Sequence, residues 1–334
     1  MNYIGSKHRL LPFLTENICK IVNADLSKMV FCDLFAGTGI VGKTFKSSVK
    51  QLIANDCEYY SYVLNRNYIG NHILLDNASE RIFQLNTLPL VEEGFIYKNF
   101  CIGGHGERQY FSDFNGQKID TMRLKIEEWK QTASISEDMY FFLLCSLLES
   151  ADKLANTASV YGSYLKKLKP MAQKQLVLEP AEFEYTATKH LVFQEDANTL
   201  INQIEGDILY LDPPYNLRQY STNYHLLNTI AEYKTFIPKG KIGVGKRFKS
   251  KYCSLKKVRQ AFESLFRDAR FKYIFLSYNN EGLMTTQELQ LMMKKYGHYD
   301  LIAKNYHRFK ADNNENRQHK AAATVEFLHI LEKR

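Results

Sequence analysis

The chain has 334 residues, of which 45% are hydrophobic and 24% charged, so it can bury a large core in two domains or in one domain with an insertion. We expect no membrane span and no signal peptide, because no apolar run approaches ~18 residues and no basic-then-apolar leader is present. The six cysteines are scattered without a Cys-x-x-Cys pair, which favours a reduced cytoplasmic protein over a disulfide framework or a zinc site.

The net charge of +8 is unevenly distributed. Residues 234–259 contain ten Lys or Arg and no acidic residue, and three glycines keep the first half of this stretch flexible. The positive charges would repel one another in a loop that faces only solvent, so we expect this stretch to face a polyanion such as a phosphate backbone.

The first 69 residues alternate between helices and strands. Hydrophobic patterning predicts a helix over 12–23, a buried strand over 30–35, a helix ending near residue 48, a strand over 51–55 and a Tyr-rich helix over 58–69. Residues 70–188 break this alternation and contain two clear helical patterns, over 118–129 and 137–154. We interpret 70–188 as a largely helical insertion that can serve as a DNA-recognition lobe.

The alternation resumes near residue 189. The predicted elements are a strand over 191–194, a helix over 197–204, a strand over 208–211, a helix over 223–233, the basic loop, a helix over 255–267 and a strand over 273–278. Thr285 and Glu288 form a capping box that opens a further helix to about residue 296. Strand-like runs over 301–306 and 324–331 have no helix between them, which predicts an antiparallel pair at the sheet edge. The fold class is therefore α/β, with a doubly wound, mostly parallel, seven-stranded sheet built from 1–69 and 189–334.

The stretch 208–215 places chemistry at the end of a buried strand. Asp212 follows four apolar residues, Pro213 and Pro214 prevent the strand from continuing, and Tyr215 follows on the rigid turn. Ligands of open α/β sheets bind outside the carboxyl ends of the strands. The sequence therefore puts a carboxylate, exposed carbonyl groups and an aromatic ring where a substrate is expected.

A glycine loop after the first strand permits three interpretations. Residues 37–44 match the dinucleotide pattern G-x-G-x-x-G, the phosphate-loop pattern G-x-x-x-x-G-K-[ST], and, from Asp33, the D-x-F-x-G-x-G loop of adenosylmethionine-dependent methyltransferases. Pro-Pro-Tyr after Asp212 has no role in handling Mg²⁺ and a nucleotide, and no hydride-transfer site follows. Asp56 suits the ribose of a dinucleotide and that of adenosylmethionine equally well. We therefore favour methyl transfer and keep the P-loop hydrolase as the alternative.

The chain resembles the Dam-like class of DNA adenine N6-methyltransferases, in which cofactor motifs come first and Asp-Pro-Pro-Tyr comes late. The matches run in the family's order and cover most of the chain. They are Tyr3-Ile4-Gly5-Ser6-Lys7, Asp33 to Gly39, Asp56, Glu195-Asp196-Ala197, Asp212-Pro213-Pro214-Tyr215 and Ser277-Tyr278-Asn279. The resemblance implies a Rossmann-like methyltransferase sheet and S-adenosyl-L-methionine as cofactor, with no metal.

Catalytic roles follow from the resemblance and agree with the chemistry of the residues. The exocyclic amine of adenine is a poor nucleophile, and its two N–H groups can be accepted by Asp212 and the Pro213 carbonyl group, which turns the nitrogen lone pair towards the sulfonium methyl. Pro214 stiffens the turn, and Tyr215 stacks on a base that has been flipped out of the duplex. The residues implied in cofactor binding are Tyr3, Gly5, Ser6, Lys7, Asp33, Phe35, Ala36, Gly37, Thr38, Gly39, Asp56, Asp196, Ala197 and Asp212.

The expected partner is double-stranded DNA. Candidate DNA-binding residues are Arg218, Asn223, Lys246, Arg247, Lys249 and Phe309. The resemblance allows a cognate restriction endonuclease as a second partner, and we expect a monomer on DNA and no membrane association. Cytosine N4 and RNA remain open as alternative methyl acceptors, because related amino-methylating enzymes carry similar motifs and charge does not distinguish the two polymers. A non-catalytic DNA-binding module is a further alternative, against which the intact tetrapeptide argues.

Overall fold

A computed structural model of the protein describes residues 7–246, 248–307 and 323–334. Within them, the chain forms two compact units. The sheet unit comprises 7–57, Thr188–Gln219 and the described part of Lys249–Arg334, and the helical unit comprises Glu58–Ala187 and the described part of Tyr220–Phe248. The helical unit therefore extends beyond the expected insertion at 70–188, and the basic stretch 234–259 is divided between the two units.

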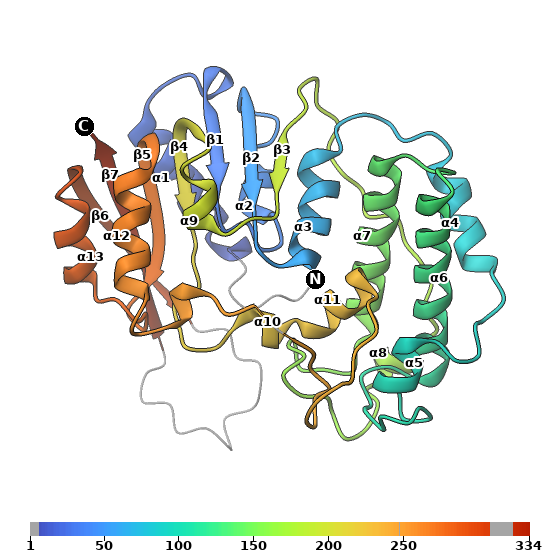
Figure 1. Cartoon of the computed structure of the whole chain (residues 1–334). Helices are drawn as coiled ribbons and strands as arrows, with labels where there is room; N and C mark the ends of the chain where they lie inside the picture. Colours follow the sequence, from blue (N-terminus) through green and yellow to red (C-terminus); the bar gives the residue numbers. More distant parts are fainter. Residues whose placement is uncertain (1–6, 247, 308–322) are drawn as a thin grey trace. The chain divides into compact units, whose positions relative to one another are not determined.

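The sheet unit contains a seven-stranded sheet in the order β3-β2-β1-β4-β5-β7-β6 (Figure 1). Its strands are β1 Val30–Asp33, β2 Gln51–Asn55, β3 Leu191–Phe193, β4 Glu205–Leu211, β5 Arg270–Asn279, β6 Gly297–His307 and β7 Ala323–Lys333. The first five strands in this order run parallel, and β7 runs antiparallel to both β5 and β6. The predicted α/β class, the mostly parallel sheet and the antiparallel edge pair are confirmed. The last two strands appear in the sheet in the reverse of their chain order, so β7 lies between β5 and the edge strand β6.

Amphipathic helices cover the sheet, because consecutive residues of its central strands are buried and successive side chains point to opposite faces. The helices of this unit are α1 Leu11–Val22, α2 Ile40–Phe45, α9 Ala197–Leu200, α12 Val258–Asp268 and α13 Thr286–Met293. Leu200, Phe262 and Leu289 bring α9, α12 and α13 into one core cluster with Leu209 and Ile274, and Figure 1 shows these three helices in front of the sheet.

Two predictions for these helices have different outcomes. The capping box of α13 is confirmed, since Thr285 accepts the Glu288 N–H (3.2 Å) and Glu288 accepts the Thr285 N–H (2.9 Å). The helix predicted over 197–204 is only one turn long, because the chain turns at Ile201 to Ile204 and enters β4 at Glu205. That entry is tight, since a Cβ at Gly206 would lie 2.7 Å from the Phe271 ring.

The helical unit contains two long helices and several shorter ones. They are α3 Tyr59–Asn65 with the π-helical turn η3 Arg66–Gly70, α4 Ala78–Thr87, α5 Phe95–Phe100, α6 Asp113–Gln131, α7 Glu137–Leu154, α8 Pro170–Gln173, α10 Tyr220–Asn223 and α11 His225–Glu232. Lys239 and Val244 exchange backbone hydrogen bonds (both 3.0 Å), which makes a small basic hairpin. No helix in the described residues is both long and apolar enough to span a membrane.

Candidate active site

The site is built where three neighbouring strands of the sheet unit end. Asp33 is the last residue of β1, Asp56 follows β2, and Asp212 follows β4. The register pairs Asp33 with Tyr210 of β4, and all three strands are parallel, so the three carboxylates gather at one edge of the sheet. The spacing of strands and acids in the sequence predicted this arrangement.

The glycine loop after β1 is fixed by two of these carboxylates. Asp56 accepts the N–H of Gly37 (2.9 Å), and Asp33 accepts the N–H of Gly42 (3.2 Å). Gly37 and Gly39 have φ values of 52° and 75°, a left-handed backbone that residues with a Cβ rarely adopt. The Ala36 N–H donates to the Asn55 carbonyl group (2.9 Å). The loop from Phe35 through Thr38 is thus held against the ends of β1 and β2, and its glycines allow a ligand to approach the backbone.

The carboxyl group of Asp33 is buried where its charged form is disfavoured. Its side chain is 1% exposed, and its Oδ1 has no hydrogen-bond partner among the described residues. Burial, followed by the charge of Asp212, raises the pKa of Asp33 to about 8, against the lowering effect of the Gly42 N–H. A buried acceptor without a donor is costly, and a cationic group would satisfy it.

Asp212 is paired with a lysine from far away in the sequence. Lys7 Nζ lies 2.9 Å from Asp212 Oδ1, and the two side chains are 5% and 19% exposed. Burial raises the pKa of Asp212 to about 6, Lys7 lowers it, and Glu326 raises it further. Although burial lowers the pKa of Lys7, the charges of Asp212 and Glu326 outweigh this effect and raise it. The pair keeps a carboxylate ionised in a site that disfavours charge.

Tyr215 stands on the rigid turn that Pro213 and Pro214 form after β4. Its carbonyl group accepts the N–H of Leu283 (2.9 Å), and its ring meets the Tyr278 ring edge to face with centroids 6.4 Å apart. Tyr278 belongs to β5 and is almost fully buried, so the orientation of Tyr215 is supported by the core.

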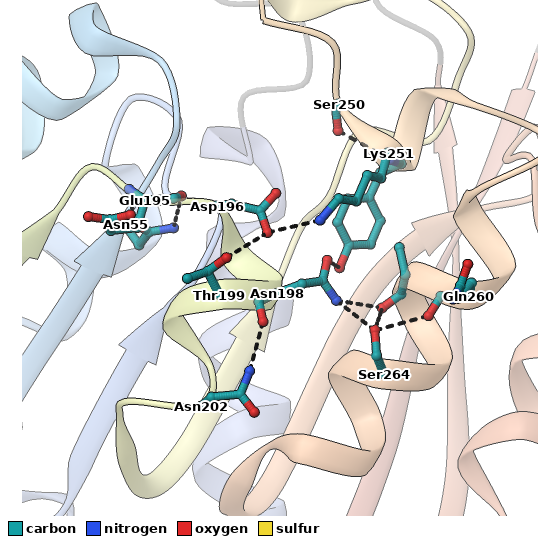
Figure 2. Close-up of polar contacts among 12 residues, drawn as sticks. Asn55, Glu195, Asp196, Asn198, Thr199, Asn202, Ser250, Lys251, Gln260 and Ser264 are labelled. Atoms are coloured by element: carbon teal, nitrogen blue, oxygen red, sulfur yellow. Dashed lines mark hydrogen bonds and ion pairs between the residues drawn. The ribbon is translucent and has the colours of Figure 1, made fainter.

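The segment Glu195-Asp196-Ala197 is attached to the end of β2. The Asn55 side chain donates to the Glu195 carbonyl group (3.2 Å) and accepts the Glu195 N–H (3.0 Å), as Figure 2 shows. Asp196 is the N-cap residue of α9, and its Oδ1 lies 3.2 Å from Lys251 Nζ and 3.4 Å from Thr199 Oγ1 (Figure 2). Ala197, which follows, is buried in the core.

The candidate DNA-binding residues are less concentrated. Arg218 and Lys249 are exposed in the sheet unit, whereas Asn223 and Lys246 belong to the helical unit. Tyr3, Gly5, Ser6, Arg247 and Phe309 lie outside the described residues.

Sequence reasoning missed several residues that shape the site. Asn55, Lys251, Tyr252 and Glu326 were not identified as site residues. The basic run contained a signal for Lys251, but the sequence contains no signal for the Asn55 clamp or for Glu326, which depend on contacts between distant segments.

The strand order, the glycine loop after β1 and the Asp-Pro-Pro-Tyr turn after β4 define a Rossmann-like methyltransferase. The profile of the D12 class N6 adenine-specific DNA methyltransferase family matches residues 3–292. The chain belongs to this family and is an adenine-specific DNA methyltransferase, and the P-loop hydrolase interpretation of residues 37–44 is not favoured.

Similar proteins share most of the chain. The Type II methyltransferase M.NlaIII of Neisseria lactamica is 60% identical over 333 residues, which are 100% of this chain and 99% of the relative. M.CviAII of Paramecium bursaria Chlorella virus 1, also a Type II methyltransferase, is 36% identical over 312 residues, 93% of each chain. The Type II methyltransferase M.FokI of Planomicrobium okeanokoites is 35% identical over the whole chain, which spans about half (53%) of that relative.

Proposed function

We propose that the protein methylates N6 of adenine within a specific site of double-stranded DNA, with S-adenosyl-L-methionine as the methyl donor, and that it is the modification enzyme of a restriction–modification pair. The observation that carries the proposal is the buried Lys7–Asp212 pair at the tip of β4, beside Asp33 at the tip of β1. The names of the similar Type II methyltransferases support a role beside a cognate endonuclease.

The residues around the glycine loop suit this donor. Oδ1 of Asp33, which has no hydrogen-bond partner among the described residues, can accept from the donor's ammonium group, and the partly exposed Asp196 can accept from its adenine amine. Asp56 already uses one oxygen on Gly37, so in our proposal it orders the loop as well as binding the ribose. The remaining proposed donor contacts are Tyr3, Gly5, Ser6, Lys7, Phe35, Ala36, Thr38, Gly39, Ala197 and Asp212. When bound, this cofactor supplies an electrophilic methyl group on a sulfonium centre.

The turn after β4 would hold the methyl acceptor. Asp212 and the Pro213 carbonyl group accept the two N–H groups of the adenine amine, which localises the nitrogen lone pair and aims it at the methyl group. Lys7 keeps Asp212 ionised and able to accept at neutral pH, since the pKa of Asp212 is about 6. Tyr215 stacks on the base, which has to leave the duplex at a cost of a few kcal/mol.

DNA contacts are assigned to both units in this proposal. Arg218, Asn223, Lys246, Arg247, Lys249 and Phe309 contact the backbone or the space left by the flipped base. The helical unit supplies sequence recognition, and the enzyme acts as a monomer. The basic stretch 234–259 supports phosphate contacts, because its ten cations have no acidic residue among them.

The test is methyl transfer by the purified chain to unmethylated duplex DNA, followed by single-molecule sequencing of the product. We expect N6-methyladenine at one recurrent sequence, and a loss of ~10³-fold or more in rate for Asp212→Ala, with donor binding retained through the other proposed donor contacts. Modified cytosine, or a preference for RNA over duplex DNA, would contradict the proposal. Methylation by Asp212→Ala at the parent rate would contradict the assigned mechanism. Glu205→Gln, an exposed carboxylate on the same strand, is the matched control.

A further inference from the structure

Residues 249–253, which we call the bridging segment, connect three parts of the candidate site within the sheet unit. The Ser250 N–H donates to Oε1 of Gln219 (2.8 Å), and the Cys253 thiol donates to the Arg218 carbonyl group (3.4 Å). Both acceptors lie just after the Asp-Pro-Pro-Tyr turn. The Tyr252 ring meets the ring of Phe35 edge to face, with centroids 5.0 Å apart, so the same segment also reaches the glycine loop.

The backbone of the bridging segment is well anchored. Tyr252 is 3% exposed, its hydroxyl group donates to Oδ1 of Asn198 (3.0 Å), and its N–H donates to the Ser250 hydroxyl group (3.2 Å). The Asn198 side chain donates in turn to the Ala261 carbonyl group (2.8 Å) and to the Ser264 hydroxyl group, which Figure 2 labels. Lys251 therefore sits on a fixed backbone, and only its flexible side chain is free to change position.

The Lys251 side chain turns to the donor side of the site. Its ammonium group lies 3.2 Å from Oδ1 of Asp196, and the two side chains are 46% and 29% exposed (Figure 2). An ion pair of this exposure is weak and easily exchanged. Lys251 is also part of the basic stretch, so one member of the pair suits a DNA phosphate and the other suits the donor's adenine amine.

We propose that Lys251 couples DNA binding to donor binding through its ion pair with Asp196. This inference rests on the proposed function, which assigns DNA to the basic stretch and the donor to Asp196. Each ligand has to break the same pair, DNA by attracting Lys251 and the donor by occupying Asp196. The ligand that binds first breaks the Lys251–Asp196 ion pair, and the second ligand then binds without that cost. Each ligand therefore tightens the binding of the other, reciprocally and by up to about five-fold.

The experiment measures donor affinity with and without DNA by calorimetry. The non-reacting probe is S-adenosylhomocysteine, and the DNA is an unmethylated duplex that carries the site mapped by sequencing. Lys251→Met removes the charge and keeps the aliphatic stem. Lys249→Met is the matched control, because Lys249 is an exposed neighbour in the same basic stretch. The wild-type protein should bind the probe about two- to five-fold more tightly with DNA present.

Lys251→Met should bind the probe more tightly than the wild type when DNA is absent, because Asp196 is then released, and DNA should no longer tighten binding. Lys249→Met should weaken DNA binding but keep the coupling. Unchanged coupling in Lys251→Met, or weaker probe binding without DNA, would overturn the inference. If the coupling result is negative but the wild-type enzyme methylates adenine, only this inference fails and the proposed function holds. If the wild-type enzyme does not methylate adenine, the proposed function itself fails.

Discussion

The two units treat buried charge in opposite ways. In the helical unit, the Arg123 guanidinium donates to the carbonyl groups of Ile230 and Ala231 at the end of α11 (2.9 to 3.2 Å) and to Glu127 (2.9 Å). Asp120 accepts the N–H groups of Ile96 and Tyr97 (both 2.8 Å) and the Tyr233 hydroxyl group. Each of these charges closes a helix end, where backbone groups otherwise lack partners.

The strand ends of the sheet unit instead gather carboxylates close together, and among the described residues Lys7 pairs with Asp212 but not with Asp33. Asp212 raises the pKa of Asp33, Glu326 raises that of Asp212, and Oδ1 of Asp33 has no hydrogen-bond partner among the described residues. Native proteins rarely leave such a cost in place, and groups with strongly shifted pKa values concentrate at functional sites. The difference teaches that the charges of the helical unit maintain the fold, whereas those of the sheet edge are arranged for ligands.

Removing a buried charge from the helical unit should have the largest effect on stability. Arg123→Met removes the guanidinium donor of two carbonyl groups of α11 and leaves Glu127 with only the Tyr140 hydroxyl group (3.1 Å), so we expect the free energy of unfolding to fall by ~3 kcal/mol. Urea unfolding of the full chain measures this change. The control is Arg270→Met, whose ion pair with Glu205 is exposed on both sides (55% and 73%) and should contribute under ~1 kcal/mol. Equal effects of the two variants would refute the contrast.

Neutralising the Asp33 carboxyl group tests whether it is unfavourably placed in the sheet unit. Because the pKa of Asp33 is about 8 in the folded protein and 3.8 in the reference state, the folded state binds the proton more tightly, and stability falls as pH rises from about 4 to 8. Asp33→Asn removes this fall, so the variant should gain stability relative to the wild type as pH rises, on the order of a few kcal/mol. The gain should be absent in Asp300→Asn, an exposed carboxylate on β6. A stability difference that does not change with pH would contradict the assignment.

The pairing of Lys7 with Asp212 predicts the acid limb of the rate profile. Methyl transfer should fall below about pH 6, where Asp212 becomes protonated. Since Lys7 lowers the pKa of Asp212, Lys7→Met should move this limb to higher pH, with a rate loss that is greatest in acid. The exposed Lys28→Met variant serves as the control. The idea fails if the Lys7→Met limb stays in place or moves to lower pH.

The smallest expected effect concerns a sheet-unit residue whose polar group is satisfied. Tyr252→Phe keeps the ring contact with Phe35 and loses only the hydrogen bond to Asn198, so it should cost ~1 kcal/mol of stability. Methyl transfer measured beside thermal unfolding should show near-parent activity. A large loss of activity at unchanged stability would mean that this hydroxyl group belongs to the chemistry.

Local patterns in the sequence predicted the framework of the fold. The buried strands, the acids at their ends and the Thr285 capping box depend on residues a few positions apart, and the structure has them as expected. Contacts between distant segments were beyond reach. Lys7 resembled a motif residue, but no spacing rule pairs it with Asp212, which lies 205 positions later. Likewise, the composition of 234–259 indicated one basic loop, whereas the folded chain divides this stretch between the two units.

We expect Asp33 to stay protonated and poorly satisfied until the proposed donor binds through its ammonium group. Calorimetric titration of S-adenosylhomocysteine at pH 7, repeated in buffers of different ionisation enthalpy, counts the protons exchanged on binding. With the pKa of Asp33 at about 8, the wild type should release close to one proton per bound ligand, and Asp33→Asn should release almost none. Binding without proton release in the wild type, or equal release in the variant, would contradict the account.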